Sequence, residues 1–441
     1  MAGFRASVAG NPNEFSVDSV MMPTRRFIAF LMMTTALVII AATAVYAEAA
    51  PPVAPVPAKP HPPEGYVLAG IDVLERARFK PLAGRNIGLI TNQTGINRQG
   101  ISTIQLLHDA AKVRLVAIFS PEHGLFGKLD IPLIGNSEDP LTGIRVFSLY
   151  GSTRIPTPDM LAGIDTLVFD IQDIGTRFYT YISTMGHAMQ AAADNRIPFV
   201  VLDRPNPING VTVSGPVLDE GRQSFVGFHR LPVRHGMTTG ELARMFKAEL
   251  QLDLELDVVA MEAWDRSAYF DSTGLKWINP SPNMRNLTEA ILYPGIGLLE
   301  TTNLSVGRGT AAPFERFGAP WLDGDLLAAE LNALDLPGVL FQPLDFTPES
   351  SKFRGEICRG VSIAIVDRER FEPVRTGLEI ARQLRRLYPD EWEIEAYDRL
   401  LGSAAVLEAI RQLRPYAEIE TIFDDELRKF MQRRSQHLLY R

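Results

Sequence analysis

The chain has 441 residues and a net charge of −8; 46% of its residues are hydrophobic and 22% are charged. This composition is typical of a globular protein with two or three domains, and it excludes collagen, coiled coils and global disorder. A mildly acidic chain lacks the positive surface that nucleic acids require, so we expect no nucleic-acid partner. The single cysteine, Cys358, excludes an intramolecular disulfide and a cysteine-rich zinc site, and we expect it to be a small buried hydrophobic residue.

The first 47 residues have the pattern of an export signal. Arg25 and Arg26 precede an uncharged apolar run over 27–46, and Ala47 fits a signal-peptidase cleavage site. We therefore expect residues 1–47 to be a signal peptide with an N-terminal extension. The alternative is a retained signal anchor, because about twenty apolar residues also span a membrane. Either way we expect export to the periplasm or the extracellular space, with membrane contact only through an uncleaved anchor.

Residues 48–65 are rich in Pro and Ala and are expected to form a semi-rigid linker. From 66 to 284, short β-branched runs alternate with helical periodicity. Strands are predicted at 86–91, 114–120, 145–149, 166–171, 198–202 and 255–260, and helices at 102–111, 158–163, 181–194 and 238–250, the last capped by Thr238 or Thr239. Continuously hydrophobic strands with helices between them favour a mostly parallel sheet that is covered on both faces. We therefore predict an α/β fold with a Rossmann-like N-terminal catalytic domain.

Residues 285–441 are predicted to form a smaller α+β C-terminal domain. We expect a strand near 360–366, a helix over 376–388, and charged amphipathic helices from there to the C-terminus. The pair Gly295-x-Gly297 lacks the third glycine and the preceding strand of a dinucleotide-binding fingerprint. We therefore expect no cofactor.

Several predicted strands of the first domain lead into polar clusters at their carboxyl ends. These clusters lie at 91–95, 120–124, 170–173 and 203–207, and their candidate site residues are Asn92, Glu122, His123, Asp170, Gln172, Asp173, Asp203, Arg204 and Asn206. In open α/β sheets, ligands bind in the crevice outside the carboxyl ends of the strands. Four strands that deliver carboxylates, amides and an arginine to one edge therefore predict a site. For Asn92 the alternative is a turn residue.

Glycoside hydrolysis is the chemistry that these carboxylates favour. It needs one carboxylic acid to protonate the leaving oxygen and a second carboxylate as base or nucleophile. Glu122 is placed in a tight loop beside His123, and we take Glu122, His123 and Asp173 as the candidate catalytic residues. The structural alternative for Glu122 is to cap the next element. The separation of the two carboxyl groups, and hence retention or inversion, stays open.

Two other functions remain open at this point. One is a metal-dependent hydrolase in which Glu122, His123 and the aspartates of the clusters bind the ion. The remaining histidines are scattered along the chain, so we expect no metal. The other is a non-catalytic sugar-binding protein, since a fold does not dictate chemistry.

Structural roles are the alternative for the charged residues of these clusters. Asp203 and Arg204 can form an ion pair that locks their loop, and one of Asp170 and Asp173 can orient Arg177 or cap a helix. The functional interpretation is that all five contact a ligand at the edge of the sheet.

The second domain adds polar residues around a glycine-rich stretch. They are Glu300, Asn303, Arg308 and Glu315, all within sixteen positions. They are expected either to form buried Arg–Glu pairs or to present a basic clamp across the cleft between the domains, where pockets commonly form. In the first domain, Tyr179 and Tyr181 are expected either to stack on a sugar ring or to pack in the core.

Several motifs together resemble the exo-β-N-acetylmuramidase NamZ family, which was formerly a domain of unknown function and is now a glycoside hydrolase family. In the first domain they are 87–95 (IGLITNQTG), 120–127 (SPEHGLFG), 169–181 (FDIQDIGTRFYTY) and 202–210 (LDRPNPING). In the second they are 293–297 (YPGIG), 300–303 (ETTN) and 306–310 (VGRGT), with Thr301 standing where the family pattern has glycine. The similarity runs from about residue 70 to the C-terminus.

The resemblance implies removal of β-linked N-acetylmuramic acid (MurNAc) from the non-reducing ends of peptidoglycan fragments, in cell-wall turnover and recycling. The implied partners are fragments in which MurNAc is linked to N-acetylglucosamine (GlcNAc), with no obligate protein partner. The resemblance also implies an active site in the cleft between the domains, with Glu122 as a catalytic residue. MurNAc carries a lactyl carboxylate, so a discriminating site needs a cation. The candidates are Arg177, Arg204 and Arg308, and we favour the last two.

Overall fold

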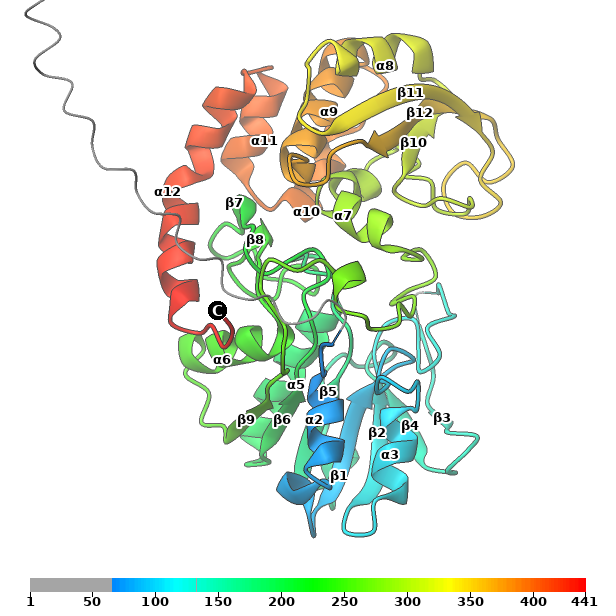
Figure 1. The fold of residues 1–441 in the computed structure, drawn as a ribbon. Coiled ribbons are helices and arrows are strands. Elements are labelled where there is room, and N and C mark those ends of the chain that lie inside the picture. Colours follow the sequence, from blue (N-terminus) through cyan, green and yellow to red (C-terminus); the bar gives the residue numbers. More distant parts are fainter. Residues whose placement is uncertain (1–65, 132) are drawn as a thin grey trace, which may run out of the picture. The chain divides into compact units, whose positions relative to one another are not determined.

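The computed structural model describes residues 66–131 and 133–441, which lie within one compact unit, His61–Arg441 (Figure 1). The predicted signal segment 1–47 and the linker 48–65 lie outside the described residues. Within the described part of the chain, no helix is both long and apolar enough to cross a membrane.

A seven-stranded sheet forms the core of the first half of this unit. Its order is β3 (Ser137–Glu138), β4 (Arg145–Ser148), β2 (Arg114–Ser120), β1 (Asn86–Thr91), β5 (Thr166–Asp170), β6 (Phe199–Leu202) and β9 (Leu256–Val259). All neighbouring strands are parallel except β3 and β4. The predicted Rossmann-like, mostly parallel sheet is confirmed. The strand order reverses at β1 and β5, which is where such folds form a ligand crevice.

Helices cover both faces of this sheet. One face carries α2 (Gly70–Arg76) and α3 (Thr103–Asp109), and the other carries α4 (Pro158–Leu161), α5 (Tyr181–Asp194) and α6 (Thr239–Glu249). Successive residues of β5 belong to different cores, because Val168 packs with α2 and α3 whereas Phe169 packs with α5 and α6. Both faces of a strand must then be apolar, which explains its continuous hydrophobicity.

Side-chain caps determine where two of the predicted helices begin. The Ser102 side chain accepts a hydrogen bond from the backbone N–H of Gln105 at the start of α3. Thr238 and Glu241 form a reciprocal capping box at the start of α6, so the cap is Thr238 rather than Thr239. Capping satisfies backbone N–H groups that a helix leaves without partners in its first turn.

The second half is built on a separate antiparallel sheet. Its order is β10 (Arg316–Ala319), β12 (Cys358–Ile365) and β11 (Val339–Phe346), with α8 (Gly324–Asn332) and α9 (Pro373–Leu387) packed against it. The remaining helices are α7 (Leu287–Ile296), α10 (Asp398–Leu401), α11 (Ala404–Arg411) and α12 (Tyr416–Ser435). The predicted smaller α+β arrangement is confirmed, and Cys358 is buried as expected. The boundary between residues 284 and 285 stays a prediction, since both halves lie in one unit.

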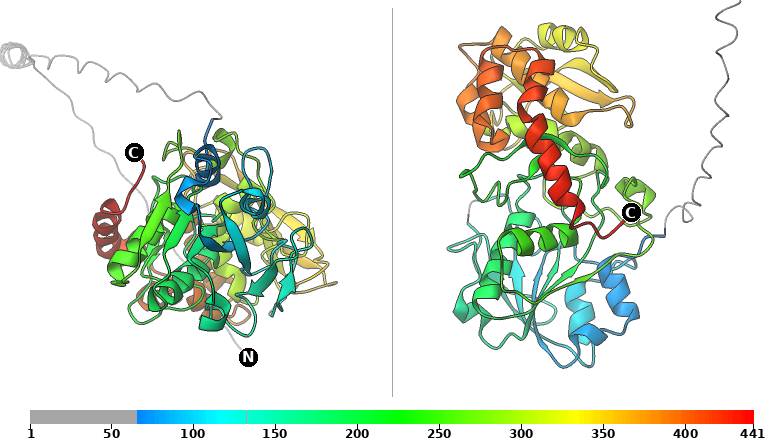
Figure 2. Two further views of the ribbon diagram at one scale, coloured as in Figure 1. Left: turned by 90° about the horizontal axis from the view of Figure 1, so that it is seen from below. Right: turned by 90° about the vertical axis from the view of Figure 1, so that its left-hand side faces the viewer.

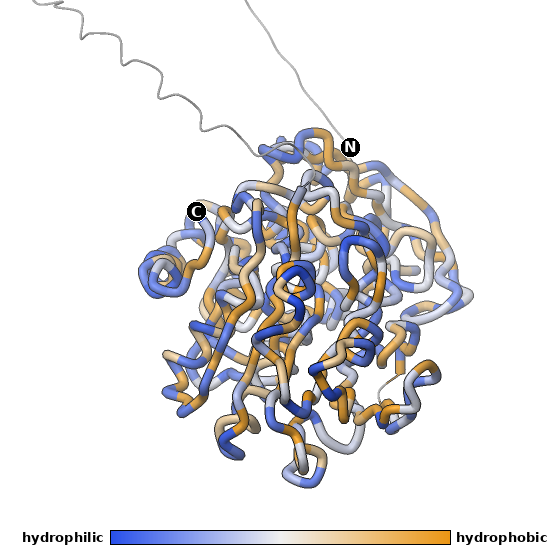
Figure 3. The backbone as a smooth tube through the Cα atoms, turned by 60° about the horizontal axis from the view of Figure 1, so that its bottom comes forward, coloured by the Kyte–Doolittle hydropathy of each residue, from blue (hydrophilic) through white to orange (hydrophobic). Residues whose placement is uncertain are grey.

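The long C-terminal helix α12 joins the two halves (Figure 2). It packs against β7 (Ser214–Val217), which pairs with β8 (Pro232–Arg234) in a two-stranded sheet. At its end, Arg433 pairs with Glu249 of α6 at 2.6 Å, and Arg434 donates to backbone carbonyls of the first half. The helix is mainly hydrophilic, as the blue tube beside the C-terminus in Figure 3 shows. These polar contacts add to a hydrophobic core that contains residues of both halves and of α12.

Candidate active site

A cavity of about 460 Å³ lies between the two halves of the described unit. Its walls come from the loops after β2 and β4, from the start of α5, and from several segments of the second half. The volume falls within the range of small-molecule binding sites. Six of the candidate residues line this cavity, namely Glu122, His123, Tyr179, Tyr181, Glu300 and Arg308.

Glu122 lies in the turn that directly follows β2. His123 and Gly124 have left-handed φ angles of 69° and 74°, which turn the chain sharply and leave Glu122 half-buried at the cavity wall. The hydroxyl of Thr180 donates to the Glu122 carboxylate, and the hydroxyl of Tyr150 forms a second hydrogen bond with it. Burial, together with the bond to Glu122, raises the pKa of Tyr150 to about 12, so the phenol is neutral at physiological pH. Both hydroxyl groups can donate or accept, so they orient Glu122 in either protonation state.

The His123 ring is oriented by a hydrogen bond with a backbone carbonyl of the same loop. Its Nδ1 lies 2.8 Å from the carbonyl oxygen of Leu129. A carbonyl can only accept, so in the neutral ring Nδ1 carries the proton and Nε2 presents its lone pair. His123 therefore offers the cavity an oriented acceptor next to Glu122.

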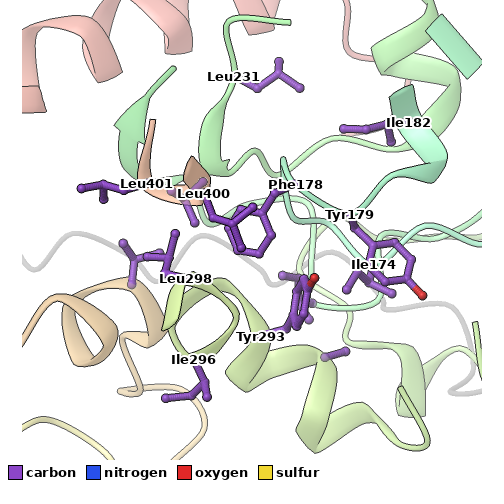
Figure 4. Packing of buried hydrophobic residues seen from close by; sticks show 14 of the residues in the cluster. Ile174, Phe178, Tyr179, Ile182, Leu231, Tyr293, Ile296, Leu298, Leu400 and Leu401 are labelled. Atoms are coloured by element: carbon purple, nitrogen blue, oxygen red, sulfur yellow. The ribbon is translucent and has the colours of Figure 1, made fainter. Parts of the chain in front are cut away.

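Aromatic rings from both halves form a continuous cluster along the cavity. Tyr179 contacts Tyr181 at 5.0 Å and Tyr293 at 5.8 Å between ring centroids, and Tyr293 contacts Phe314 at 4.7 Å. Figure 4 shows Phe178 and Tyr179 of the first half beside Tyr293 of the second. Burial raises the pKa of the three tyrosines, which therefore remain neutral. Tyr179 is thus both part of the core and part of the cavity wall.

The second half contributes an ion-pair cluster at the cavity. Arg308 pairs with Glu300 and also with Asp130 of the first half, the latter at 2.7 Å. Burial alone would lower the pKa of Arg308, but the two carboxylates outweigh burial and raise it. Of the two interpretations offered for Glu300 and Arg308, the Arg–Glu pair is the one that forms. Asp130 also accepts a hydrogen bond from the Asn283 amide, and no sequence motif had indicated it.

The strand-end residues Asp170 and Arg204 form a buried ion pair with each other. Arg204 donates to both carboxylate oxygens of Asp170, with Nε 2.6 Å from Oδ1, and to the carbonyl of Ile96. Thr103 donates to the same carboxylate. Neither charged residue lines the cavity, so their expected contacts with substrate are corrected to structural ones. The sequence had offered Asp203 as the ion-pair partner of Arg204, whereas Arg204 pairs with Asp170.

The other strand-end residues are engaged within the protein. Asp203 accepts hydrogen bonds from Thr238, Thr239 and Gly240 at the start of α6 and from Tyr440 near the C-terminus. The remaining amides bond backbone or neighbouring polar groups, namely Asn92 with Thr94, Gln172 with Asp173 and Pro205, and Asn206 with Met237 and Ile208. None of these four residues lines the cavity, which corrects their predicted contacts with substrate. A second hollow, beside Gln172 and Arg204, measures only about 20 Å³ and is too small for a sugar.

Arg177 is also corrected, because it is fully buried. Its guanidinium donates to four backbone carbonyls, two in the first half (Pro216 and Leu231) and two in α10 (Leu400 and Leu401). Burial lowers its pKa to about 9. Arg177 therefore fastens the two halves together instead of binding a ligand.

Asp173 is buried, close enough to Tyr179 and Tyr181 to interact with them electrostatically, and does not line the cavity. Its Oδ2 accepts a hydrogen bond from the backbone of Gly175 at 2.7 Å and lies 3.7 Å from Nε2 of His235. Among the described residues its Oδ1 has no hydrogen-bond partner. Asp173 neither orients Arg177 nor contacts the cavity, so the structure does not support its predicted place beside the substrate.

Two predicted residues of the second half also lie outside the cavity lining. The Asn303 amide donates to the carbonyl of Glu391 and accepts from the backbone N–H of Glu393. Glu315 accepts a hydrogen bond from the Asn286 side chain at 3.0 Å. Both residues hold loops of the second half together, and their expected substrate contacts stay a prediction.

Sequence reasoning missed several residues of the cavity wall. Tyr150 follows β4, so the strand-end rule that found Glu122 would have found it too. Arg154 lies further along the same loop, and Phe225 comes from the loop before β8. Neither belongs to a motif, and only the folded chain brings them together.

The metal-ligand alternative requires several ligands around one point. In residues 66–131 and 133–441, no three His, Cys, Asp or Glu side chains come close enough together to hold an ion.

Comparison with known sequences gives matches over most of the chain. Residues 87–288 match the family described as exo-β-N-acetylmuramidase NamZ, N-terminal, and residues 291–440 match its C-terminal counterpart. A protein from Bacillus subtilis (strain 168), named peptidoglycan β-N-acetylmuramidase NamZ, is 44% identical over 378 residues, covering 85% of this chain and 91% of that protein.

Two crystal structures of DUF1343 family proteins from Bacteroides fragilis NCTC 9343 have a similar fold. One is 40% identical with a TM-score of 0.80, covering 86% of this chain and 100% of the other. The second is 29% identical with a TM-score of 0.71, covering 85% and 99%.

Proposed function

The chain belongs to the exo-β-N-acetylmuramidase NamZ family, and on this premise we propose that it hydrolyses the terminal β-glycosidic bond of MurNAc. The substrates are peptidoglycan fragments with MurNAc at the non-reducing end, and the process served is cell-wall turnover. The observation that carries the proposal is the position of Glu122: a carboxyl group at the end of a parallel strand, oriented by two hydroxyl groups, on the wall of a cavity.

The cavity supplies the carboxyl groups that glycoside hydrolysis needs. Glu122 from the first half and Glu300 from the second are the two carboxylates on its described lining. Most glycosidases use one carboxyl group to protonate the leaving oxygen and another as base or nucleophile. We assign the first role to Glu122, whose loop leaves it free of ion pairs among the described residues, and the second to Glu300 beside Arg308.

Aromatic rings and an oriented histidine complete the site. The cluster around Tyr179 and Tyr293 offers apolar ring surface to one face of the sugar. His123 presents Nε2 as an acceptor for a sugar hydroxyl. Since these groups come from both halves, the substrate is bound between them.

The test is hydrolysis of a chromogenic β-MurNAc glycoside by the wild-type protein and by Glu122→Gln. General acid–base catalysis contributes about 10²- to 10⁴-fold, so we expect kcat to fall by that factor. The matched control is Glu138→Gln, which changes an exposed glutamate on the edge strand β3, outside the cavity lining, and should leave kcat unchanged. NMR of the first anomer released distinguishes retention from inversion.

Failure of the wild-type protein to release MurNAc from any β-glycoside would overturn the proposal. Undiminished kcat in Glu122→Gln would instead remove Glu122 from the acid role. Folding of each variant is checked by its thermal unfolding midpoint.

We also propose that the protein is exported. The support is the Arg25-Arg26 pair followed by the apolar run over 27–46, and the substrate, which lies in the cell envelope. Cell fractionation should place the protein in the periplasm or the medium, with a mature N-terminus after Ala47. Recovery of the full-length chain in the membrane fraction would indicate a retained anchor, and recovery in the cytoplasm would contradict export.

A further inference from the structure

Three arginines line the cavity, and they differ in what neutralises them. Arg308 is paired with Glu300 and Asp130. Arg154 and Arg399 have no ion pair among the described residues. A ligand carboxylate would have to compete with two protein carboxylates for Arg308, whereas the other two guanidinium groups are available.

Arg154 differs from Arg399 because aromatic rings hold it. Its guanidinium carbon lies 4.2 Å from the ring centroid of Phe225 and 5.3 Å from that of Tyr150. Stacking on a ring uses the face of the guanidinium and leaves its edge N–H donors free. Within the described chain those donors have no hydrogen-bond partner, and Arg399 has no comparable ring contact. Arg154 is therefore pre-oriented to donate two parallel hydrogen bonds from its edge.

Tyr150 relates the position of Arg154 to that of Glu122, the proposed catalytic acid. Its hydroxyl bonds the carboxyl group of Glu122, and its ring contacts Arg154, so one phenol ring separates the two groups. In MurNAc the lactyl group is attached at O3, and the bond to be broken is at C1, so one pyranose ring separates the lactyl carboxylate from the leaving oxygen. Arg154 and Glu122 therefore both lie beside the same phenol on the wall of the cavity, as the lactyl group and the bond to be broken lie on the same pyranose ring.

We propose that Arg154, which lies over the neighbouring rings of Phe225 and Tyr150, binds the lactyl carboxylate of MurNAc and makes the site selective for this acidic sugar. The inference rests on the proposed function and deepens it. It replaces Arg204 and Arg308, the cations favoured from the sequence, because both are committed to carboxylates of the protein. A planar guanidinium edge matches a carboxylate in a bidentate arrangement, which a lone lysine cannot reproduce.

The experiment compares two chromogenic substrates, the β-MurNAc glycoside and the same glycoside with its lactyl carboxylate converted to a carboxamide. The variants are Arg154→Gln, Arg154→Lys and Arg399→Gln. The matched control is Arg145→Gln, because Arg145 is exposed on β4 and stacks on Phe147 at 4.7 Å but lies outside the cavity lining. Kinetic constants are measured for both substrates, and thermal unfolding verifies folding.

We expect the wild type to prefer the carboxylate. In Arg154→Gln, kcat/KM for the carboxylate should fall about ten- to hundredfold while the carboxamide is affected little, so the preference disappears. Arg154→Lys should keep part of the preference, and Arg145→Gln all of it.

Three results overturn the inference while leaving the proposed function standing: an unchanged preference in Arg154→Gln, an equal loss for both substrates, or loss of the preference in Arg399→Gln instead. Equal loss would show that Arg154 only supports the loop. If Arg154→Gln does not fold, Arg154→Lys decides. A reduced preference for the carboxylate substrate in Arg154→Lys supports the assignment. A full preference in Arg154→Lys, together with a lost preference in Arg399→Gln, contradicts it. A wild type that cleaves neither glycoside would contradict the proposed function itself.

Discussion

The polar side chains at the carboxyl edge of the large sheet divide into two regions. One is a buried polar layer formed by Asp170, Arg204 and Asp203, whose charged groups are bonded to other parts of the protein. The other is the cavity wall with Glu122 and Arg154, whose groups are oriented by hydroxyls and rings but carry no ion pair within the described chain. Both regions follow the same strand-end rule, so position at the edge does not distinguish structural from functional residues. What distinguishes them is how completely the charged group is bonded to other charged or polar groups of the protein.

The physical cause of the difference is solvation. A charge that folding removes from water costs free energy unless it gains a partner, so the buried layer is closed by internal hydrogen bonds. At the cavity wall, water can solvate the charges until a ligand replaces it. Charges with free donors or acceptors therefore persist there.

Breaking the buried layer should produce the largest change in stability. Asp170→Ala leaves the guanidinium of Arg204 buried without its carboxylate, and we expect a loss of about 3–5 kcal/mol in the free energy of unfolding. Urea unfolding measures this loss. Glu122→Gln, from the cavity wall, should unfold like the wild type although it loses activity. A loss below about 1 kcal/mol for Asp170→Ala would contradict the distinction between the regions.

Glu289 tests the comparison further, because its carboxyl group is buried but only one of its two oxygens has a hydrogen-bond partner among the described residues. It accepts a hydrogen bond from the backbone of Arg285, while its Oε1 has no partner among the described residues. Burial, with Glu315 nearby, raises its pKa from 4.5 to about 7. A group whose pKa is raised by folding contributes stability below its unfolded pKa and loses that contribution as pH rises through the folded pKa.

The wild type should therefore lose stability relative to Glu289→Gln between pH 4.5 and 7. Each pKa unit corresponds to about 1.4 kcal/mol, so we expect the variant to be more stable by up to about 3 kcal/mol at pH 8 and the gap to close near pH 4.5. Thermal unfolding across this range measures the gap, with Glu138→Gln as the exposed control. A gap that does not depend on pH would show that Glu289 titrates alike in the folded and unfolded chain.

The smallest effect is expected at the ion pair beside the cavity. Asp130 and Arg308 are partly exposed, and exposed pairs contribute about 0.2–1 kcal/mol. Asp130→Asn should therefore reduce the free energy of unfolding by no more than this amount, and the reduction should shrink at high salt. Urea titrations at two salt concentrations test it. If Asp130→Asn lowered the free energy of unfolding as much as Asp170→Ala does, the Asp130–Arg308 pair would behave like the buried polar layer.

The sequence by itself determined six strands of the large sheet, the sheet type and one catalytic candidate, but it predicted no strand at β3, β7, β8, β10 or β11. Continuous apolar runs such as 166–171 need two covered faces, which only a doubly covered parallel sheet provides. The cap of α6 and the tight turn at Glu122 depend on residues within a few positions, so local patterns sufficed there.

Only the tertiary structure decided which polar residues face the ligand. Asp203 and Arg204 are adjacent in sequence, yet Arg204 pairs with Asp170 because β5 and β6 lie side by side in the sheet. Arg154 and Phe225 come from loops far apart in the chain, and neither has a motif. A charge binds substrate or holds the fold according to which partners folding brings within reach, and the order of residues does not encode that.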